Sequence, residues 1–130
     1  MTGLVSPTDR DIATGMGSRL LVSSLPEAYG ADILLITPEI TIGIQRKEIP
    51  HDFISSIQDG RLTKETSLMS EKCDVPIVLG EGHFRYFPNG SVASNAPRAV
   101  QKAVFDRFTR KSIRKLKFEI CITSKFTHMN

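Results

Sequence analysis

The segment from Ile33 to Gln45 restricts the possible folds of this chain more than any other part of the sequence. Residues 33–36 are all large and aliphatic, and Thr37-Pro38-Glu39 follows as a turn in which the proline fixes one backbone angle. Beyond the turn, isoleucine occupies every second position from Ile40 to Ile44, which is the period of a half-buried strand. The segment therefore predicts a β-hairpin with one face in the core.

The rest of the sequence predicts further strands and helices on either side of this hairpin. Gly15 and Gly17 should keep the early part irregular, and Gly60 should bend a later helix. In chain order we expect a short strand at 4–5, irregular chain at 9–19, a turn or helical turn at 25–30, a helix at 52–71, a strand at 77–79, a hairpin turning at Asn89-Gly90, a helix at 97–117 that divides near 109–112, and a strand at 119–124. This order predicts an α/β fold, a mixed sheet flanked by helices, in a single domain over residues 1–130.

The composition excludes several classes of protein. Hydrophobic residues make up 40% and charged residues 24%, as in ordinary globular domains. No apolar run approaches the roughly 20 residues of a membrane span, and no secretory signal is visible at the N-terminus. Cys73 and Cys121 lack a paired metal-binding spacing, so we expect two reduced structural thiols in a cytoplasmic protein with no membrane partner.

The positive charge of the chain is concentrated near its C-terminus. Residues 101–130 hold only two acids, Asp106 and Glu119, against eight basic residues, and the first hundred residues carry a net negative charge. An acidic body with a basic C-terminal helical arm (residues 97–117) is typical of a nuclease, because carboxylates hold metal and basic groups hold phosphates. A solvated basic helix face would have the same composition, so charge does not distinguish the two.

Four polar residues stand where the apolar pattern of the hairpin pauses. Asp32 precedes the first strand, Gln45 and Lys47 end the second on the same side, and Asp52 occupies an N-cap position before Phe53. Oxygen ligands around a hard cation, with a lysine to offset phosphate charge, are what phosphodiester hydrolysis requires. Each residue also has a plainer explanation: a strand-end acid, a solvated lysine or a simple helix cap.

A longer string makes the pattern specific. Ala31-Asp32, the apolar strand, Gln45-Arg46-Lys47, Asp52-Phe53-Ile54 and Asp59-Gly60-Arg61-Leu62 follow one another in order, and residues 77–82 supply a further strand. Over residues 28–82 the chain resembles the XPF-type structure-specific endonuclease domain, a branch of the restriction-endonuclease-like fold. The family pattern is Gly-Asp, Glu-Arg-Lys, three residues, Asp, and a helix with Gly-Arg-Leu. Versions with Gln-Arg-Lys resemble compact bacterial and phage members.

The resemblance implies a role for each matching residue. Asp32, Gln45 and the backbone carbonyl of Arg46 would ligate Mg²⁺ or Mn²⁺, Lys47 would be the catalytic lysine, and Asp52 would be the acid at the helix start. From the resemblance and the charge pattern together, the expected DNA contacts are Arg46, Arg61, Lys102, Arg107, Arg110, Lys111, Arg114, Lys115 and Lys117.

Three departures from the family pattern leave an alternative open. Gln45 stands where the family has glutamate, four residues separate Lys47 from Asp52, and Asp9-Arg10-Asp11 only partly matches an early Asp-x-Arg-Glu motif. We therefore expect a metal-dependent endonuclease for branched DNA, such as Holliday junctions or flaps, in recombination or repair. It would act as a homodimer or with a partner subunit, in a bacterial or phage-infected cytoplasm. The alternatives are an inactive DNA-binding scaffold and, less favoured, a sequence-specific restriction-type nuclease.

Overall fold

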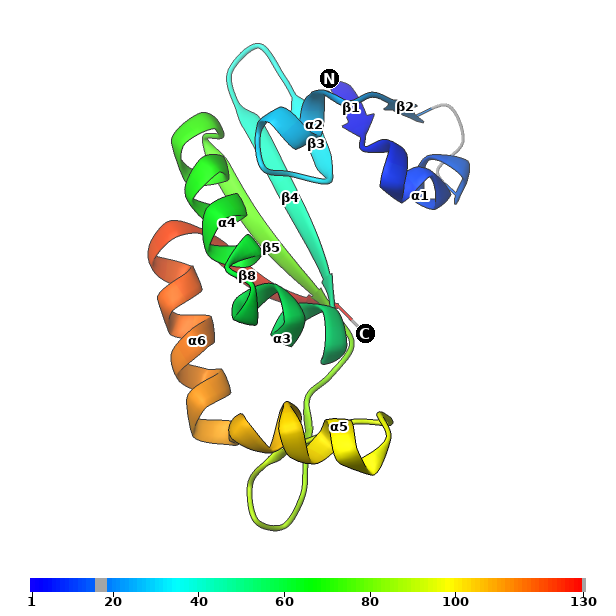
Figure 1. Ribbon diagram of the computed structural model, residues 1–130. Helices are drawn as coiled ribbons and strands as arrows, with labels where there is room; N and C mark the ends of the chain where they lie inside the picture. The colour runs from blue at the N-terminus through cyan, green and yellow to red at the C-terminus, as the bar shows by residue number, and fades with distance from the viewer. Residues whose placement is uncertain (16–18, 130) are drawn as a thin grey trace.

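The computed structural model of the chain describes residues 1–15 and 19–129. A mixed six-stranded sheet with the order β2-β1-β3-β4-β5-β8 forms its centre (Figure 1). Its strands are β1 (Thr2–Val5), β2 (Leu20–Val22), β3 (Ile33–Ile36), β4 (Thr41–Glu48), β5 (Val75–Glu81) and β8 (Lys125–Met129), and a separate hairpin is formed by β6 (Arg85–Tyr86) and β7 (Val92–Ala93). The predicted α/β fold, a mixed sheet flanked by helices, is confirmed.

The helices divide between the two faces of this sheet (Figure 1). The three longest, α3 (His51–Gln58), α4 (Arg61–Lys72) and α6 (Arg110–Thr123), pack their apolar sides against one core that includes Leu34 of β3. On the other face, α1 (Arg10–Gly15) packs on a smaller cluster that includes Ile33. Adjacent residues of one strand point to opposite faces, so Leu34 lies in the larger core and Ile33 in the smaller cluster. The shorter helices are η1 (Pro7–Asp9), α2 (Leu25–Ala28), α5 (Arg98–Ala103) and η3 (Phe105–Arg107).

The predicted hairpin is present as β3 and β4, which pair antiparallel with Ile33 opposite Ile44 and Leu34 opposite Gly43. β4 continues to Glu48 and pairs in parallel with β5. Gly43 has a packing reason, because a Cβ at this position would lie 2.6 Å from the sulfur of Cys73 at the end of α4. The sequence Gln45-Arg46-Lys47 therefore lies inside a central strand and not in a loop.

The predicted irregular stretch at residues 9–19 was wrong in its first half. Residues 10–15 form α1, whose Ile12 and Ala13 pack against the cluster on the second sheet face. Burial of this apolar side stabilises a helix that Gly15 argued against. Residues 16–18 lie outside the described ranges.

The predicted helix over residues 52–71 is two helices. Gly60 has a φ of 80°, in the left-handed region that glycine adopts readily, and it separates α3 from α4. The predicted N-cap role of Asp52 was wrong, because Pro50 is the capping residue and Asp52 lies in the first turn of α3.

The C-terminal elements differ from the prediction in their bounds. A helix over 97–117 was expected, but α5 ends at Ala103 and α6 runs from Arg110 to Thr123. The expected division near 109–112 is confirmed, since Thr109 caps α6 through a hydrogen bond from the Ser112 backbone N–H. Residues 119–123 are helical and not a strand, because Ile113 and Ile120 are buried together on one helix side. The final strand is β8.

Two smaller predictions are confirmed. The hairpin at residues 84–92 forms, with Gly90 at a φ of 88° in its turn, and the thiols of Cys73 and Cys121 are free. In the described ranges, each helix is too short or too polar to cross a lipid bilayer.

Replacement of Phe53 by alanine should lower the free energy of unfolding by about 3–5 kcal/mol. Phe53 is fully buried, and its ring meets those of Phe84 and Phe126 edge to face at centroid distances of 5.4 and 5.6 Å. The matched control is Phe118→Ala at a residue that is 70% exposed, where the change should stay within about 0.5 kcal/mol. Urea unfolding followed by circular dichroism measures both, and equal effects would contradict this account of the core.

Candidate active site

The alternation of β4 sorts the Gln-Arg-Lys side chains onto two faces of the sheet. Gln45 and Lys47 point toward α3 and α4, and each is only 3% exposed. The ammonium of Lys47 lies 3.2 Å from Oε1 of Glu65 on α4. A buried ammonium requires such a partner, and Glu65 also holds the Lys47 side chain in one direction.

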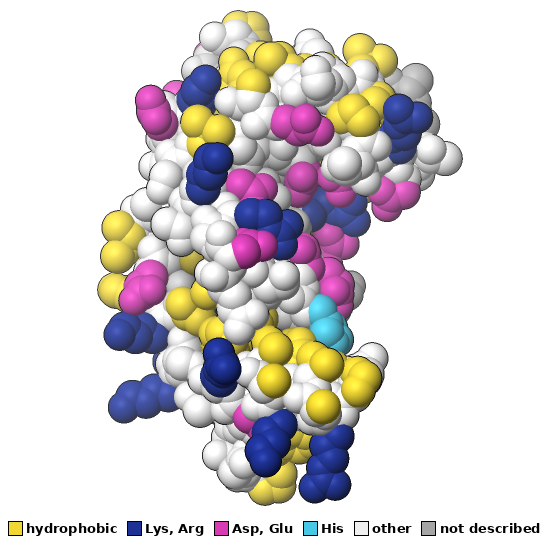
Figure 2. Space-filling view, in the orientation of Figure 1, with side chains coloured by type: hydrophobic (Ala, Val, Ile, Leu, Met, Phe, Trp, Pro, Cys, Tyr) yellow, Lys and Arg dark blue, Asp and Glu magenta, His cyan; other side chains and the backbone are white. Residues whose placement is uncertain are grey.

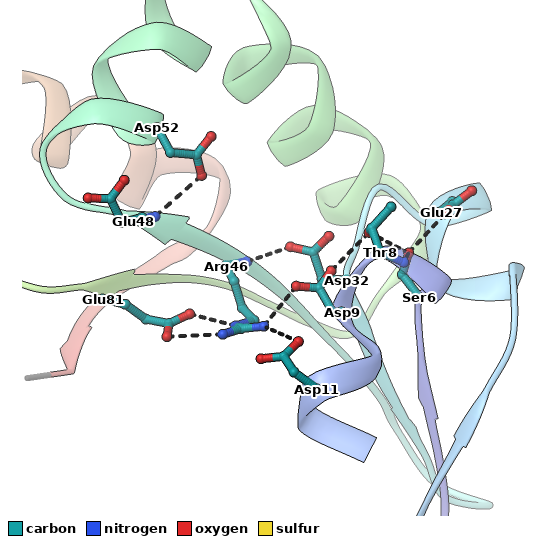
Figure 3. A network of polar contacts seen from close by, with 10 residues as sticks. All are labelled: Ser6, Thr8, Asp9, Asp11, Glu27, Asp32, Arg46, Glu48, Asp52 and Glu81. Carbon is teal, nitrogen blue, oxygen red and sulfur yellow. Dashed lines mark hydrogen bonds and ion pairs between the residues drawn. The ribbon is translucent and has the colours of Figure 1, made fainter. Parts of the chain in front are cut away.

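Asp32 lies at the start of β3, next to the same part of β4. Its Oδ2 atom accepts a hydrogen bond of 2.8 Å from the backbone N–H of Arg46 (Figure 3). Burial raises the pKa of the Asp32 carboxyl to about 7, and the charges of Asp9 and Glu65 act in the same direction, while the Arg46 N–H and the Lys47 ammonium oppose them. The structure therefore brings Asp32 into the electrostatic neighbourhood of Lys47 and Glu65.

The Arg46 side chain points to the opposite face and is surrounded by carboxylates (Figure 3). Its Nε donates to Oε1 of Glu81 at 2.5 Å and its Nη2 to Oε2 at 3.2 Å, while Nη1 lies 2.8 Å from Asp9 and 3.8 Å from Asp11. These contacts, the Glu81 hydrogen bond foremost, raise the pKa of Arg46 further above its ordinary value. Arg46 was expected to contact DNA, but here it ties β4 to β5 and to the η1–α1 segment.

A cavity of about 310 Å³ opens beside Asp32. Glu65, Arg61 and Lys64 of α4 line it together with the N-terminal residues Ser6 and Thr8. The Nε of Arg61 lies 2.7 Å from Oδ2 of Asp59, which raises the pKa of Arg61. Figure 2 shows acidic and basic side chains mixed around the indentation in the middle of the molecule. Arg61 and Asp32 thus line the same cavity.

Asp52 is not joined to this group. Its Oδ2 accepts a 3.3 Å hydrogen bond from the backbone N–H of Glu48 (Figure 3). Within the described ranges, no hydrogen bond or ion pair links Asp52 to Asp32, Gln45 or Lys47. The contacts of Asp52 therefore fasten the start of α3 to the end of β4.

The chemistry of the donor set fits a hard divalent cation. The Gln45 Oε1 atom is buried and has no hydrogen-bond partner among the described residues, which leaves an amide oxygen available as a ligand. The pKa of Asp32 is raised by burial first and by the charges of Asp9 and Glu65 second, and a bound cation would offset both effects. Among the residues described, no three acidic, His or Cys side chains gather closely enough to hold a metal. The set is accordingly one carboxylate and one amide, and Mg²⁺ commonly completes such a set with water and substrate phosphate.

Sequence reasoning missed one acidic residue near the site, Glu65, and noted another, Asp9, only as part of an incomplete Asp9-Arg10-Asp11 motif. Glu65 lies one helical turn after Arg61, so the i, i+4 spacing could have placed both on the side of α4 that faces Asp32. Asp9 belongs to a stretch expected to be irregular, and only the packing of η1 and α1 brings it to Arg46.

The predicted DNA-binding residues of the C-terminal part lie on three elements. Lys102 belongs to α5, Arg107 to η3, and the others to α6: Arg110, Lys111, Arg114, Lys115 and Lys117. Only Lys117 among the seven is half-buried, and none forms an ion pair with a carboxylate in the part of the chain that the structure describes. Figure 2 shows basic side chains with few acidic ones over this lower part of the molecule. The arrangement can attract a polyanion.

The raised pKa of Asp32 predicts a pH-dependent stability in metal-free protein. The native state holds this proton up to about pH 7, whereas the ordinary value is 3.8. The native state thus binds more protons in that window, so the stability contributed by Asp32 is full at low pH and is lost as pH rises toward 7. The free energy of unfolding of the wild type minus that of Asp32→Asn should fall by up to about 1.4 kcal/mol per pH unit.

Urea unfolding in EDTA at several pH values between about 4 and 8 measures this difference. Asparagine keeps an acceptor for the Arg46 N–H, and all other titrating groups are common to both proteins. A difference that is constant across the window would contradict the raised pKa.

Comparison with known proteins places the chain in a family. A family model described as the ERCC4 domain matches residues 13–127. No curated protein sequence matches the chain. Among solved structures, XPF from Aeropyrum pernix has a TM-score of 0.58 at 17% identity, covering 98% of this chain and 53% of that one.

XPF from Aeropyrum pernix in complex with DNA gives a TM-score of 0.59 at 19% identity, covering 98% of this chain and 56% of that one. At these identities the likeness concerns the fold, and the chain spans about half the length of both structures. Since the family model covers residues 13–127, the chain belongs to the ERCC4 domain family, as its XPF-type motif implied.

Proposed function

We propose that the chain is a divalent-metal-dependent endonuclease that acts on branched DNA, such as four-way junctions or flaps, in recombination or repair. One observation carries the proposal: a half-buried carboxylate, a buried amide oxygen with no hydrogen-bond partner among the described residues and a buried ammonium lie at adjoining ends of β3 and β4, on a fold shared with XPF. The cytoplasm of a bacterial or phage-infected cell is the proposed setting.

In this proposal Asp32 and Gln45 hold Mg²⁺ or Mn²⁺, with the Arg46 carbonyl as a further oxygen ligand. A bound divalent cation polarises the scissile phosphate and acidifies a bound water. Because the pKa of Asp32 is raised to about 7, metal binding near neutral pH is coupled to release of its proton.

Lys47 is the residue proposed to stabilise negative charge during catalysis. Its ammonium is fixed by Glu65 at 3.2 Å, so it is oriented before DNA arrives. Such a preorganised cation offsets the negative charge that develops on the phosphate during attack by water. Arg61 lines the cavity beside Asp32 and, in this proposal, contacts a phosphate or stabilises the site. Asp52 stabilises the site by fixing the start of α3.

The C-terminal helices supply the proposed grip on the duplex. One of the solved structures of similar fold is XPF in complex with DNA, and α5, η3 and α6 carry eight basic residues without carboxylate partners in the described ranges. The chain spans about half the length of those structures. In this proposal a second copy or a partner subunit contributes to the recognition of branched DNA.

Lys47→Met should reduce cutting of a labelled four-way junction in Mg²⁺ by at least about a hundredfold, as expected when a positioned charge at the reacting phosphate is lost. Methionine keeps the length of the buried side chain. The charge-matched control is Lys125→Ala on β8, an exposed lysine outside the site, which should cut like the wild type. Gel assays at equal protein concentration measure both, and junction cutting by the Lys47 variant at the control rate would refute the mechanism.

A second candidate function is a catalytically inactive DNA-binding scaffold of the same family. The observation that favours it is Gln45 itself, since an amide coordinates Mg²⁺ without contributing charge and lies buried beside an ion-paired lysine. Metal binding distinguishes this scaffold from the nuclease.

Gln45→Glu should tighten Mn²⁺ binding by about tenfold or more, because it adds one charge to the ligand set. Gln45→Leu is the matched control of similar size and should abolish the binding. Isothermal titration of the metal-free proteins with MnCl₂ gives both constants. Wild-type protein that takes up no Mn²⁺ yet binds DNA would favour the scaffold, and equal constants for the two variants would place the metal elsewhere.

A further inference from the structure

A second cavity, of about 380 Å³, lies between the β6–β7 hairpin and one side of α6. It is lined by Phe84, Tyr86, Arg110, Ile113, Arg114 and Lys117. Two aromatic rings and one isoleucine thus form its apolar part, and all three of its charged residues are positive. No residue of this cavity belongs to the candidate active site.

The cations of this cavity rest on aromatic faces. The guanidinium carbon of Arg110 lies 4.7 Å from the ring centroid of Tyr86, and the Lys117 ammonium lies 5.1 Å from that of Phe84 and 5.5 Å from that of Phe126. In the part of the chain described by the structure, none of the three cations pairs with a carboxylate. A ring face attracts a cation but accepts few of its hydrogen bonds. Donors therefore remain available for an anion.

The spacing of the three residues concentrates their charge. Arg110, Arg114 and Lys117 follow one another at i, i+4 and i+7 on α6, which places them on one helix side where like charges repel. Burial lowers the pKa of Lys117, which shows that its ammonium is partly removed from water without a compensating acid. A negative group in the cavity would relieve both costs.

The walls of the cavity are fixed to each other by the backbone. The Arg110 N–H donates to the Gly90 carbonyl at 3.0 Å, and the Val92 N–H donates to the Phe108 carbonyl at 2.8 Å. The hairpin and the first turn of α6 therefore form one unit, and Arg110 is held against Tyr86 before any ligand binds. Figure 1 shows α6 beginning at this end of the molecule, below α3.

We propose that this cavity is a phosphate site that binds one backbone phosphate of DNA, held by Arg110, Arg114 and Lys117. Two guanidinium forks and an ammonium match an anion with several acceptor oxygens. Stacking of an unpaired base is disfavoured, because Arg110 and Lys117 already cover ring faces of Tyr86 and Phe84. The identification of DNA as the source of the phosphate rests on the proposed function, whereas the phosphate chemistry rests on the cavity alone.

Two double variants of α6 with the same change in net charge test the proposal. Arg110→Gln with Arg114→Gln empties the cavity of its guanidinium groups, and Lys111→Gln with Lys115→Gln removes two exposed charges from the same helix outside it. Binding of a labelled duplex is followed by fluorescence anisotropy in EDTA over a range of KCl concentrations. The cavity variant should bind about tenfold more weakly, with the slope of log Kd against log salt reduced by about one, and the control variant about threefold more weakly at most.

Equal losses of DNA affinity in the two double variants would overturn the site, since diffuse electrostatic attraction alone predicts equal losses. The conservative pair Arg110→Lys with Arg114→Lys keeps the charge and should recover most of the affinity, which a merely misfolded cavity would not. Thermal unfolding of each variant accompanies the binding data. Since no metal is present, failure here is separate from failure of the nuclease mechanism, which is judged by cutting in Mg²⁺.

Titration of the wild type with inorganic phosphate at constant ionic strength separates the two sources of a phosphate group. Weak phosphate binding that is lost in the cavity variant, together with its loss of DNA affinity, supports a DNA phosphate. The assignment to DNA would be overturned if the wild type bound inorganic phosphate tightly while the cavity variant bound DNA as well as the control variant does. Absence of both effects would overturn the cavity as a phosphate site.

Discussion

The hydrogen bond from the Arg46 N–H to the Asp32 carboxylate is the contact on which the candidate site depends. It is made at 2.8 Å by an acid whose charge is disfavoured by burial and by two neighbouring carboxylates. A buried carboxylate remains in place only if its oxygens find donors or a cation. The start of β3 is thereby fixed beside β4, at the cavity where the proposed metal would bind.

The two faces of β4 carry side chains with different roles. Gln45 and Lys47 enter the helix-covered face, where Glu65 of α4 is the partner that a buried ammonium needs. Arg46, between them, leaves on the other face and joins β5 and the N-terminal segment through carboxylates. Pairs of this kind are costly to break when buried. The basic residue of the motif that points away from the cavity therefore holds the sheet and its flanking segment together.

The basic residues of α6 lie apart from the carboxylates around β4. The carboxylates gather around β4 and the first residues of α1, while the basic residues of α6 extend along an element that begins at the β6–β7 hairpin. A polyanion attracted to α5 and α6 would thus be held mainly by groups other than those at the metal site. In the proposed nuclease, this separation would allow DNA binding and cutting to be altered independently.

The sequence by itself determined the hairpin, the position of its acid, the same-face relation of Gln45 and Lys47, and the family, because these follow from local periodicity and motif spacing. It misjudged α1, the cap of α3 and the end of α6, where packing on the sheet overrides the local signals of glycine and alternation. Only the tertiary structure decided that Glu65 partners Lys47, that Arg46 is bound by Glu81 and Asp9, and that α6 closes a cationic cavity over Tyr86. Each of those contacts joins residues distant in the chain, and no spacing rule fixes such pairs.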